Sequence, residues 1–290
     1  MMTGSGVRAE VLVLAGVLAV PGMGSGQTAE SGAGPIVSMA WLRAQLDSAG
    51  TEPLAVIAVD RDGEAFAREH IPGARFLTHQ ATLDHHSHRL LPPAELATVL
   101  ARAGAHDAAR IVLYGDDPMS LGWLYMALAS LGHGDHTFVL DGNARAWRAA
   151  GHPVSSTPGG AGTGRLTVRT APDFVVDAAW VRGHLEDAGT RLLDVRSPRE
   201  WSNGTIPGGV PILWQDFFAD LQLGRFKSPQ ALRAVFERAG VRSSQTAVTY
   251  CAVGMRASLA LLAARAAGVP AKVYVGSWAD WTATPANPRH

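Results

Sequence analysis

QTAVTYCAVGMRAS, residues 245–258, is the most informative stretch of the sequence. Its first part, residues 245–250, is apolar and β-branched, which predicts a buried strand. Cys251 follows at once, Gly254 offers the backbone freedom that a tight curl requires, and an Ala/Leu-rich helix is expected over 258–267. A thiol between a strand end and a helix N-terminus lies where open α/β sheets hold their ligands.

Cys251 is the only cysteine of the chain, so an intrachain disulfide is excluded and the thiol is either core filling or a working group. The N–H groups of the curl, the helix dipole and the charge of Arg256 would all favour a thiolate. The same groups could hold a persulfide or the departing oxyanion of a sulfur donor. We therefore expect Cys251 to be the nucleophile. The residues expected to surround the bound anion are Ala252, Val253, Gly254, Met255 and Arg256.

The chain repeats itself at an offset of about 135 residues, a pattern that indicates two copies of one structural unit. MAWLRAQL at 39–46 corresponds to AAWVRGHL at 178–185, and an apolar strand ending in an acid follows in each copy, at Asp60 and at Asp194. Later landmarks keep the same order. They are IPGA at 71–74 with IPGG at 206–209, and VLYG at 112–115 with VTYC at 248–251.

In each copy, short runs rich in Val, Ile and Leu alternate with helical patterns such as 93–103 and 229–239. This alternation predicts an α/β fold, with two tandem domains that each have a mainly parallel sheet flanked by helices. Ser, Gly and Pro dominate 155–164, which is typical of a linker. We expect a first domain over 36–154, a linker over 155–172 and a second domain over 173–285.

The sequence resembles the two-domain rhodanese family of thiosulfate and 3-mercaptopyruvate sulfurtransferases. The resemblance covers residues 36–285 and rests on four segments together: CAVGMR at 251–256, DVRSPREW at 194–201, HIPGA at 70–74 and GSWADW at 276–281. It implies an inactive first copy and a second copy in which Cys251 takes a sulfane sulfur and passes it to cyanide or another thiol.

The resemblance further implies that Arg199 binds the anionic group of the donor, in an alignment with a one-residue gap. We expect no cofactor and no metal. Thiosulfate-using members of the family commonly have basic residues directly after the cysteine, where this chain has the neutral Ala252 and Val253. The loop also differs from the Cys-Gly-Ser-Gly pattern that is typical of mercaptopyruvate-using members. The donor is therefore left open between a thiosulfate-like and a mercaptopyruvate-like anion.

The first copy has no thiol at the corresponding loop, where Asp116 and Asp117 would repel an anionic donor. These two carboxylates could alternatively bind a metal, although acidic residues in a turn are usually just solvated. The histidines at 79, 85, 86 and 88 are a second metal hypothesis against a default of surface residues. Asp60, Asp194 and Arg196 are expected to bind backbone or one another, and the recurring tryptophans to pack in the cores.

Basic and acidic residues number 25 each, so neither a nucleic-acid-binding surface nor an acidic tail is indicated. Arg8 precedes an apolar run at 11–20 that is too short to span a bilayer, and Gly24 and Gly26 suit a signal-peptidase site. We expect a signal peptide over 1–26 and a periplasmic or secreted protein, which would be cytoplasmic if the signal is not cleaved. The alternative is a disordered tail. No segment is expected to span a membrane.

Three other functions compete with a small-molecule sulfurtransferase. Phosphatases and arsenate reductases place five residues between Cys and Arg, whereas four lie between Cys251 and Arg256, which would crowd a phosphate. A non-catalytic binding module would be free to lose the loop cysteine, which this chain keeps. A sulfur carrier with a protein thiol as its acceptor needs the same persulfide chemistry and stays open.

Overall fold

The computed structural model describes residues 1–2, 34–48, 53–84, 89–160, 162, 164–169 and 173–289. Two five-stranded sheets form its framework, and every strand in both sheets is parallel to its neighbours. The first has the order β1 (Ile36–Val37), β5 (Thr137–Leu140), β4 (Arg110–Tyr114), β2 (Leu54–Val59), β3 (Arg75–Leu77). The second has the order β6 (Val175–Val176), β12 (Ala271–Tyr274), β11 (Thr246–Tyr250), β7 (Thr190–Asp194), β8 (Val210–Pro211). The identical order confirms the tandem α/β fold.

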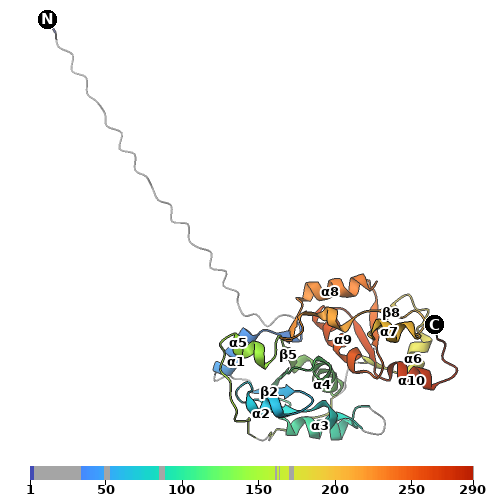
Figure 1. Ribbon diagram of the computed structural model, residues 1–290, viewed down its shortest axis with the longest axis horizontal. Helices are drawn as coiled ribbons and strands as arrows, with labels where there is room; N and C mark the ends of the chain where they lie inside the picture. Colours follow the sequence, from blue (N-terminus) through green and yellow to red (C-terminus); the bar gives the residue numbers. More distant parts are fainter. Residues whose placement is uncertain are drawn as a thin grey trace.

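Helices connect the strands and cover both sheets (Figure 1). In the first half they are α1 (Met39–Asp47), α2 (Glu64–Arg68), α3 (Pro93–Arg102), α4 (Pro118–Ser130) and α5 (Ala144–Ala149). In the second half they are α6 (Ala178–Gly183), α7 (Pro198–Ser202), α8 (Pro229–Arg238), α9 (Met255–Ala266) and α10 (Ser277–Ala283). Proline at the first helical position starts α3, α4, α7 and α8, because its missing N–H has no partner there in any helix.

Short 3₁₀ turns and one hairpin complete the described chain. The turns are η1 (His79–Thr82), η2 (Gly134–His136) and η3 (Trp214–Phe217), and β9 (Phe218–Asp220) pairs antiparallel with β10 (Arg225–Phe226). Residues expected to form a linker lie along the first half: Ser155 pairs with His70, Arg169 N–H donates to Leu131 O, and Leu166 is buried. No helix among the described residues could cross a membrane.

The two halves meet along α4 and α9, which Figure 1 shows side by side. Both helices are buried on nearly all sides, as expected of helices enclosed by a sheet on one side and a second helix on the other. At their crossing a Cβ on Gly122 would lie 2.4 Å from Leu259 Cα, so only glycine permits this approach. One hydrophobic cluster therefore includes residues of both halves.

Strand register aligns the two copies more accurately than their sequences do. Tyr114 lies opposite Ala58 in the first sheet, and Tyr250 lies opposite Asp194 in the second. The counterpart of Asp194 is therefore Ala58, and Asp60 corresponds to Arg196. The sequence pairing of Asp60 with Asp194 was wrong by two residues, because β2 continues one residue past that position whereas β7 ends at Asp194.

Candidate active site

Cys251 lies directly after β11, the central strand of the second sheet, and four residues before Met255, where α9 begins. Cys251 is 1% exposed, and its thiol forms no disulfide. Backbone groups on both sides hold the loop: Val195 N–H, directly after β7, donates to Tyr250 O, and Trp278 N–H of α10 donates to Cys251 O. The thiol thus lies at the carboxyl end of a parallel sheet, as the sequence predicted.

Gly254 closes the curl around the sulfur. Its φ of +94° is left-handed, and its N–H donates to Cys251 Sγ at 3.1 Å. A Cβ at this position would lie 2.6 Å from Val275 O, so a side chain would meet both backbone strain and a clash. The helix begins at Met255, three residues before the expected start at Ser258, because Gly254 itself acts as the N-cap residue without a side-chain hydrogen bond.

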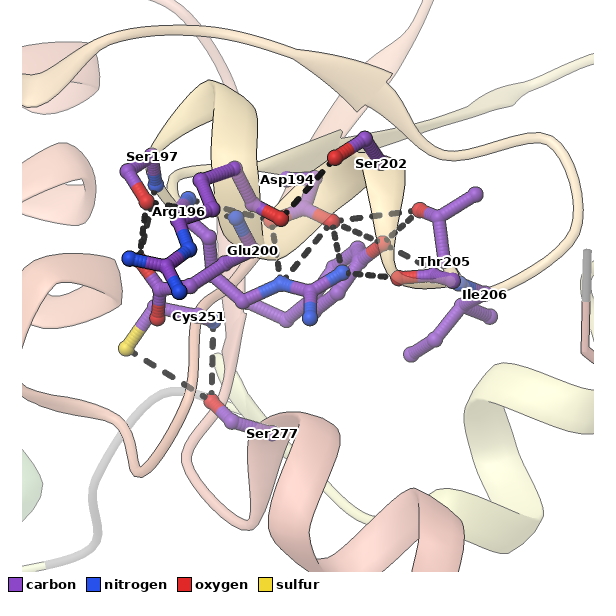
Figure 2. Close-up of polar contacts among 12 residues, drawn as sticks. Asp194, Arg196, Ser197, Glu200, Ser202, Thr205, Ile206, Cys251 and Ser277 are labelled. Carbon is purple, nitrogen blue, oxygen red and sulfur yellow. Dashed lines mark hydrogen bonds and ion pairs between the residues drawn. The ribbon is translucent and has the colours of Figure 1, made fainter.

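Ser277 supports the cysteine from below (Figure 2). Its Oγ accepts from Cys251 N–H at 3.0 Å, donates to Tyr274 O at 2.9 Å, and lies 4.0 Å from Cys251 Sγ. A hydroxyl has one proton, and the shorter contact assigns it to Tyr274 O. Ser277 is fully buried and has a φ of +56°, a conformation that costs a non-glycine residue roughly 1–2 kcal/mol.

Arg256 forms a two-pronged ion pair with Glu200 of α7. Nη1 lies 2.7 Å from Oε2 and Nη2 lies 2.6 Å from Oε1. These hydrogen bonds lower the pKa of Glu200 to about 2, and Ser197 contributes by donating its N–H and hydroxyl to Oε2. The pKa of Arg256 is raised, by the Glu200 hydrogen bonds first and also by the charge of Cys251, against the opposing effect of burial. The Glu200 carboxylate therefore fixes the orientation of the guanidinium.

A buried polar network lies under the loop, and Figure 2 shows its members converging. Asp194 and Arg196 form an ion pair at 2.6 Å, and Arg196 also stacks on Trp278, 4.5 Å from the ring centre. Asp194 accepts from the hydroxyls of Thr205 and Tyr250, at 3.1 and 2.7 Å. The expectation that Asp194 and Arg196 bind one another is confirmed, and the network fixes the ends of β7 and β11.

The other residues predicted for the site differ in their exposure. Ala252 is half-buried and its carbonyl accepts from Ala279 N–H, Met255 packs against the main hydrophobic cluster, and Val253 is 52% exposed. Arg199 lies on α7 next to Glu200, is exposed, and has no side-chain hydrogen bond or ion pair among the described residues. The site therefore has a buried cysteine, a paired arginine and a second arginine at its exposed edge.

The corresponding loop of the first copy is closed against the end of β2. Gly115 takes the place of Cys251, and a Cβ there would lie 1.8 Å from Val59 O. Asp117 caps α4 and pairs with Arg61 at 3.0 Å, and Asp60 accepts from the N–H groups of Arg61 and Asp116. Burial is the main reason why the pKa of Asp60 is raised. This loop has neither a thiol nor room for one.

The metal hypotheses receive no geometric support from the described residues. Among them no group of three or more His, Cys, Asp or Glu converges on a point. His79 instead hydrogen-bonds to Ser120 Oγ at 2.7 Å, and burial lowers its pKa. The histidines at 85, 86 and 88 and nearly all of the expected signal peptide over 1–26 lie outside the described residues.

Sequence reasoning missed two residues of the site. Glu200 had a visible signal, because Ser197 and Glu200 have the spacing of a capping box, and both reciprocal hydrogen bonds are present. Ser277 had none, since its partner Cys251 is 26 residues away and the contact depends on how β12 and α10 return to the loop.

Comparison with known proteins gives consistent matches. The family model described as "Rhodanese-like domain" matches twice, at 38–150 and 177–284. A probable 3-mercaptopyruvate sulfurtransferase of Pseudomonas aeruginosa is 31% identical over 77% of this chain and 84% of its own. The thiosulfate sulfurtransferase of Azotobacter vinelandii is 29% identical over 80% and 90%, and human 3-mercaptopyruvate sulfurtransferase is 29% identical over 74% and 78%.

Solved structures share the fold at lower identity. The anaerobic ergothioneine biosynthesis enzyme from Chlorobium limicola superposes with a TM-score of 0.76 at 22% identity, over 88% of this chain and 69% of that one. The structure of YnjE superposes with a TM-score of 0.77 at 22% identity, over 88% and 67%.

Proposed function

The chain belongs to the rhodanese-like family and is a sulfurtransferase, and we propose that it moves a sulfane sulfur from a small anionic donor to a thiol or cyanide through a persulfide on Cys251. The donor class is thiosulfate-like or mercaptopyruvate-like. The observation that carries the proposal is the loop itself, in which Gly254 N–H points at Cys251 Sγ from 3.1 Å at the start of α9.

With thiosulfate, the Cys251 thiolate would attack the outer sulfur and form a new S–S bond. The bond between the two sulfur atoms of the donor would break, and sulfite would leave with its electron pair. A thiolate or cyanide acceptor would then attack the outer sulfur of the persulfide, and the electron pair of the broken S–S bond would return to Cys251. No external oxidant or reductant is needed, because the sulfane sulfur changes partners without net loss of electrons.

The surroundings of Cys251 favour an anion at each stage. The Gly254 N–H and the N-terminal end of α9 present partial positive charge, and Arg256 adds a full charge that Glu200 partly offsets. Arg199, exposed and without an ion pair among the described residues, is proposed as the cation that receives the donor.

A protein thiol is a second candidate acceptor. Val253 on the Cys251 loop is 52% exposed, and Trp201 on α7, the helix that holds Glu200, is 38% exposed, so both elements present an exposed apolar side chain. Small anions gain nothing from such side chains, whereas a docking protein can bury them. Export of the protein remains a proposal from the sequence alone, and the mass of the protein isolated from its native cells would test it.

Steady-state transfer to cyanide tests the proposed reaction. Thiosulfate and 3-mercaptopyruvate are supplied in turn, and the thiocyanate formed is measured for the wild-type chain and for Arg199→Ala. We expect activity with at least one donor and a rise in that donor's KM of about 10-fold for the variant, which is the loss of roughly one charge-assisted contact. Absence of thiocyanate with both donors would contradict the small-molecule reaction and leave the protein acceptor as the alternative.

A further inference from the structure

A side chain of the first copy forms an ion pair with α10 of the second copy. Leu83 and Leu90 pair as an isolated antiparallel bridge in the first half. Arg89, which directly precedes Leu90, places Nη2 3.1 Å from Asp280 Oδ1 in α10. Arg89 and Leu90 also line one wall of a cavity of about 440 Å³ whose other walls include Tyr274, Val275 and Gly276. An arginine of the first copy thus pairs with the segment that follows β12.

Asp280 transmits this contact to the turn before α10. Tyr274 OH donates to Oδ2 at 2.7 Å, and Asp280 N–H donates to Gly276 O at 3.1 Å. A Cβ on Gly276 would lie 2.5 Å from Oδ2, so the carboxylate lies directly against the backbone of the turn. The turn is therefore held between the side chain of Asp280 and the strand end at Tyr274.

The same turn forms the floor of the cysteine loop. Ser277, in its left-handed conformation, binds Cys251 N–H, and the N–H groups of Trp278 and Ala279 donate to the carbonyls of Cys251 and Ala252. Three hydrogen bonds of the loop thus depend on where residues 274–280 lie. A strained serine keeps its position only if its surroundings determine it.

We infer that Arg89 is a positioning residue for Cys251: through Asp280 it fixes the turn that carries Ser277. The catalytically silent copy would then contribute to the reaction without touching substrate. This inference rests on the proposed function, since it concerns the geometry in which the persulfide forms. Misplacement by a fraction of an ångström in such a site lowers the rate constant more than it lowers binding.

The repeat of the fold supplies a matched control, an ion pair in which the second copy provides the arginine and the first copy the carboxylate. Arg225, in the hairpin of the second copy, pairs with Asp141 of the first copy at 3.3 Å, and Asp141 precedes α5 as Val275 precedes α10. The two pairs have similar exposure, 59% and 32% for Arg89 and Asp280 against 40% and 24% for Arg225 and Asp141. Only the first pair adjoins the turn that holds Cys251.

Four variants of the full chain test the inference: Arg89→Ala, Asp280→Asn, Arg225→Ala and Asp141→Asn. Asparagine removes the negative charge but keeps an acceptor oxygen, for Tyr274 OH in Asp280→Asn and for Phe226 N–H in Asp141→Asn. Hydrogen exchange is followed in the peptides covering 250–258 and 274–282, together with kcat and KM for the donor. For the two variants of the first pair we expect exchange roughly 10-fold faster in these peptides. We also expect kcat to fall about 3- to 30-fold with KM within about twofold.

The control variants should leave both measurements within about twofold of wild type, and Arg89→Lys, which can still pair with Asp280, should recover most of kcat. Equal behaviour of the two pairs, or no change in exchange for Arg89→Ala, would overturn the inference. If the wild-type chain transfers no sulfur, the proposed function fails, while hydrogen exchange still decides whether Arg89 holds the turn.

Discussion

At the scale of single residues, the site depends on how the charges around Cys251 are paired. The bidentate contact between Arg256 and Glu200 means that the guanidinium is not simply a free cation aimed at the sulfur. Glu200 is itself fixed by Ser197, so the ion pair joins α7 to the first turn of α9. We interpret Arg256 as serving two purposes, partial compensation of the thiolate and attachment of the loop to α7.

Removing Arg256 should therefore do more than remove one positive charge. Arg256→Ala leaves the Glu200 carboxylate without its partner beside an anionic site, and we expect kcat/KM to fall on the order of 10- to 1000-fold. The double variant Arg256→Ala, Glu200→Gln should regain part of this loss, because it removes the repelling carboxylate. Unchanged kcat/KM with a lowered melting temperature would instead show that Arg256 acts only in stability.

Glu200 also predicts how stability varies with pH. Its pKa is lowered from 4.5 to about 2 in the folded chain, so its contribution is present above pH 4.5 and is lost as the pH falls toward 2. The stability difference between wild type and Glu200→Gln should be constant near neutral pH and shrink through this acid range. Urea midpoints of both proteins at several pH values measure it, and a difference that does not change with pH would contradict the ion pair.

At the scale of elements, the decisive feature is the left-handed residue that starts α9. Gly254→Ala should cost stability twice, once for the φ of +94° and once for the contact with Val275 O. Gly73→Ala is a matched control, because Gly73 has a φ of +76° and open space around its Cβ position. We expect about 1–2 kcal/mol of destabilisation for the control and more for Gly254→Ala, which should also lose transfer activity. Urea unfolding and thiocyanate formation check this, and equal destabilisation would exclude the clash.

The elements show which features the sequence could predict. The helices beginning at Pro93 and Pro229 were visible because proline starts them and apolar residues recur with helical period. The start of α9 was not visible, since Gly254 caps it by backbone conformation alone. Cys251 and Arg256 could be singled out because they are close in the sequence, whereas Ser277 and Asp280 meet the site only after β12 joins the sheet.

At the scale of the whole molecule, the two copies of the fold differ in what they contribute to the site. The second copy holds the buried Asp194–Arg196 pair under its loop, whereas strand register places Ala58 and Asp60 at those positions in the first copy. The first copy supplies a packing surface through α4 and an arginine through Arg89.

The acidic loop of the first copy should be dispensable for the reaction. Asp116→Ala should leave kcat/KM within about threefold of wild type. Asp117→Ala should lower stability by roughly 0.5–2 kcal/mol, because Asp117 caps α4, with a similarly small effect on kcat/KM. Steady-state assays and urea unfolding of both variants measure this, and a loss of activity as deep as that caused by removing the thiol would show that the first copy takes part in the chemistry.

The persulfide on Cys251 is the central claim, and intact mass analysis tests it most directly. The wild-type chain and Cys251→Ser are each incubated with thiosulfate or 3-mercaptopyruvate, and the excess donor is removed. The intact mass of each protein is then measured before and after cyanide is added. Because Cys251 is the only cysteine, wild type should gain one sulfur atom and lose it to cyanide, and Cys251→Ser should gain none, since a serine hydroxyl cannot form a persulfide. A sulfur gained by Cys251→Ser, or transfer activity retained by that variant, would contradict the account.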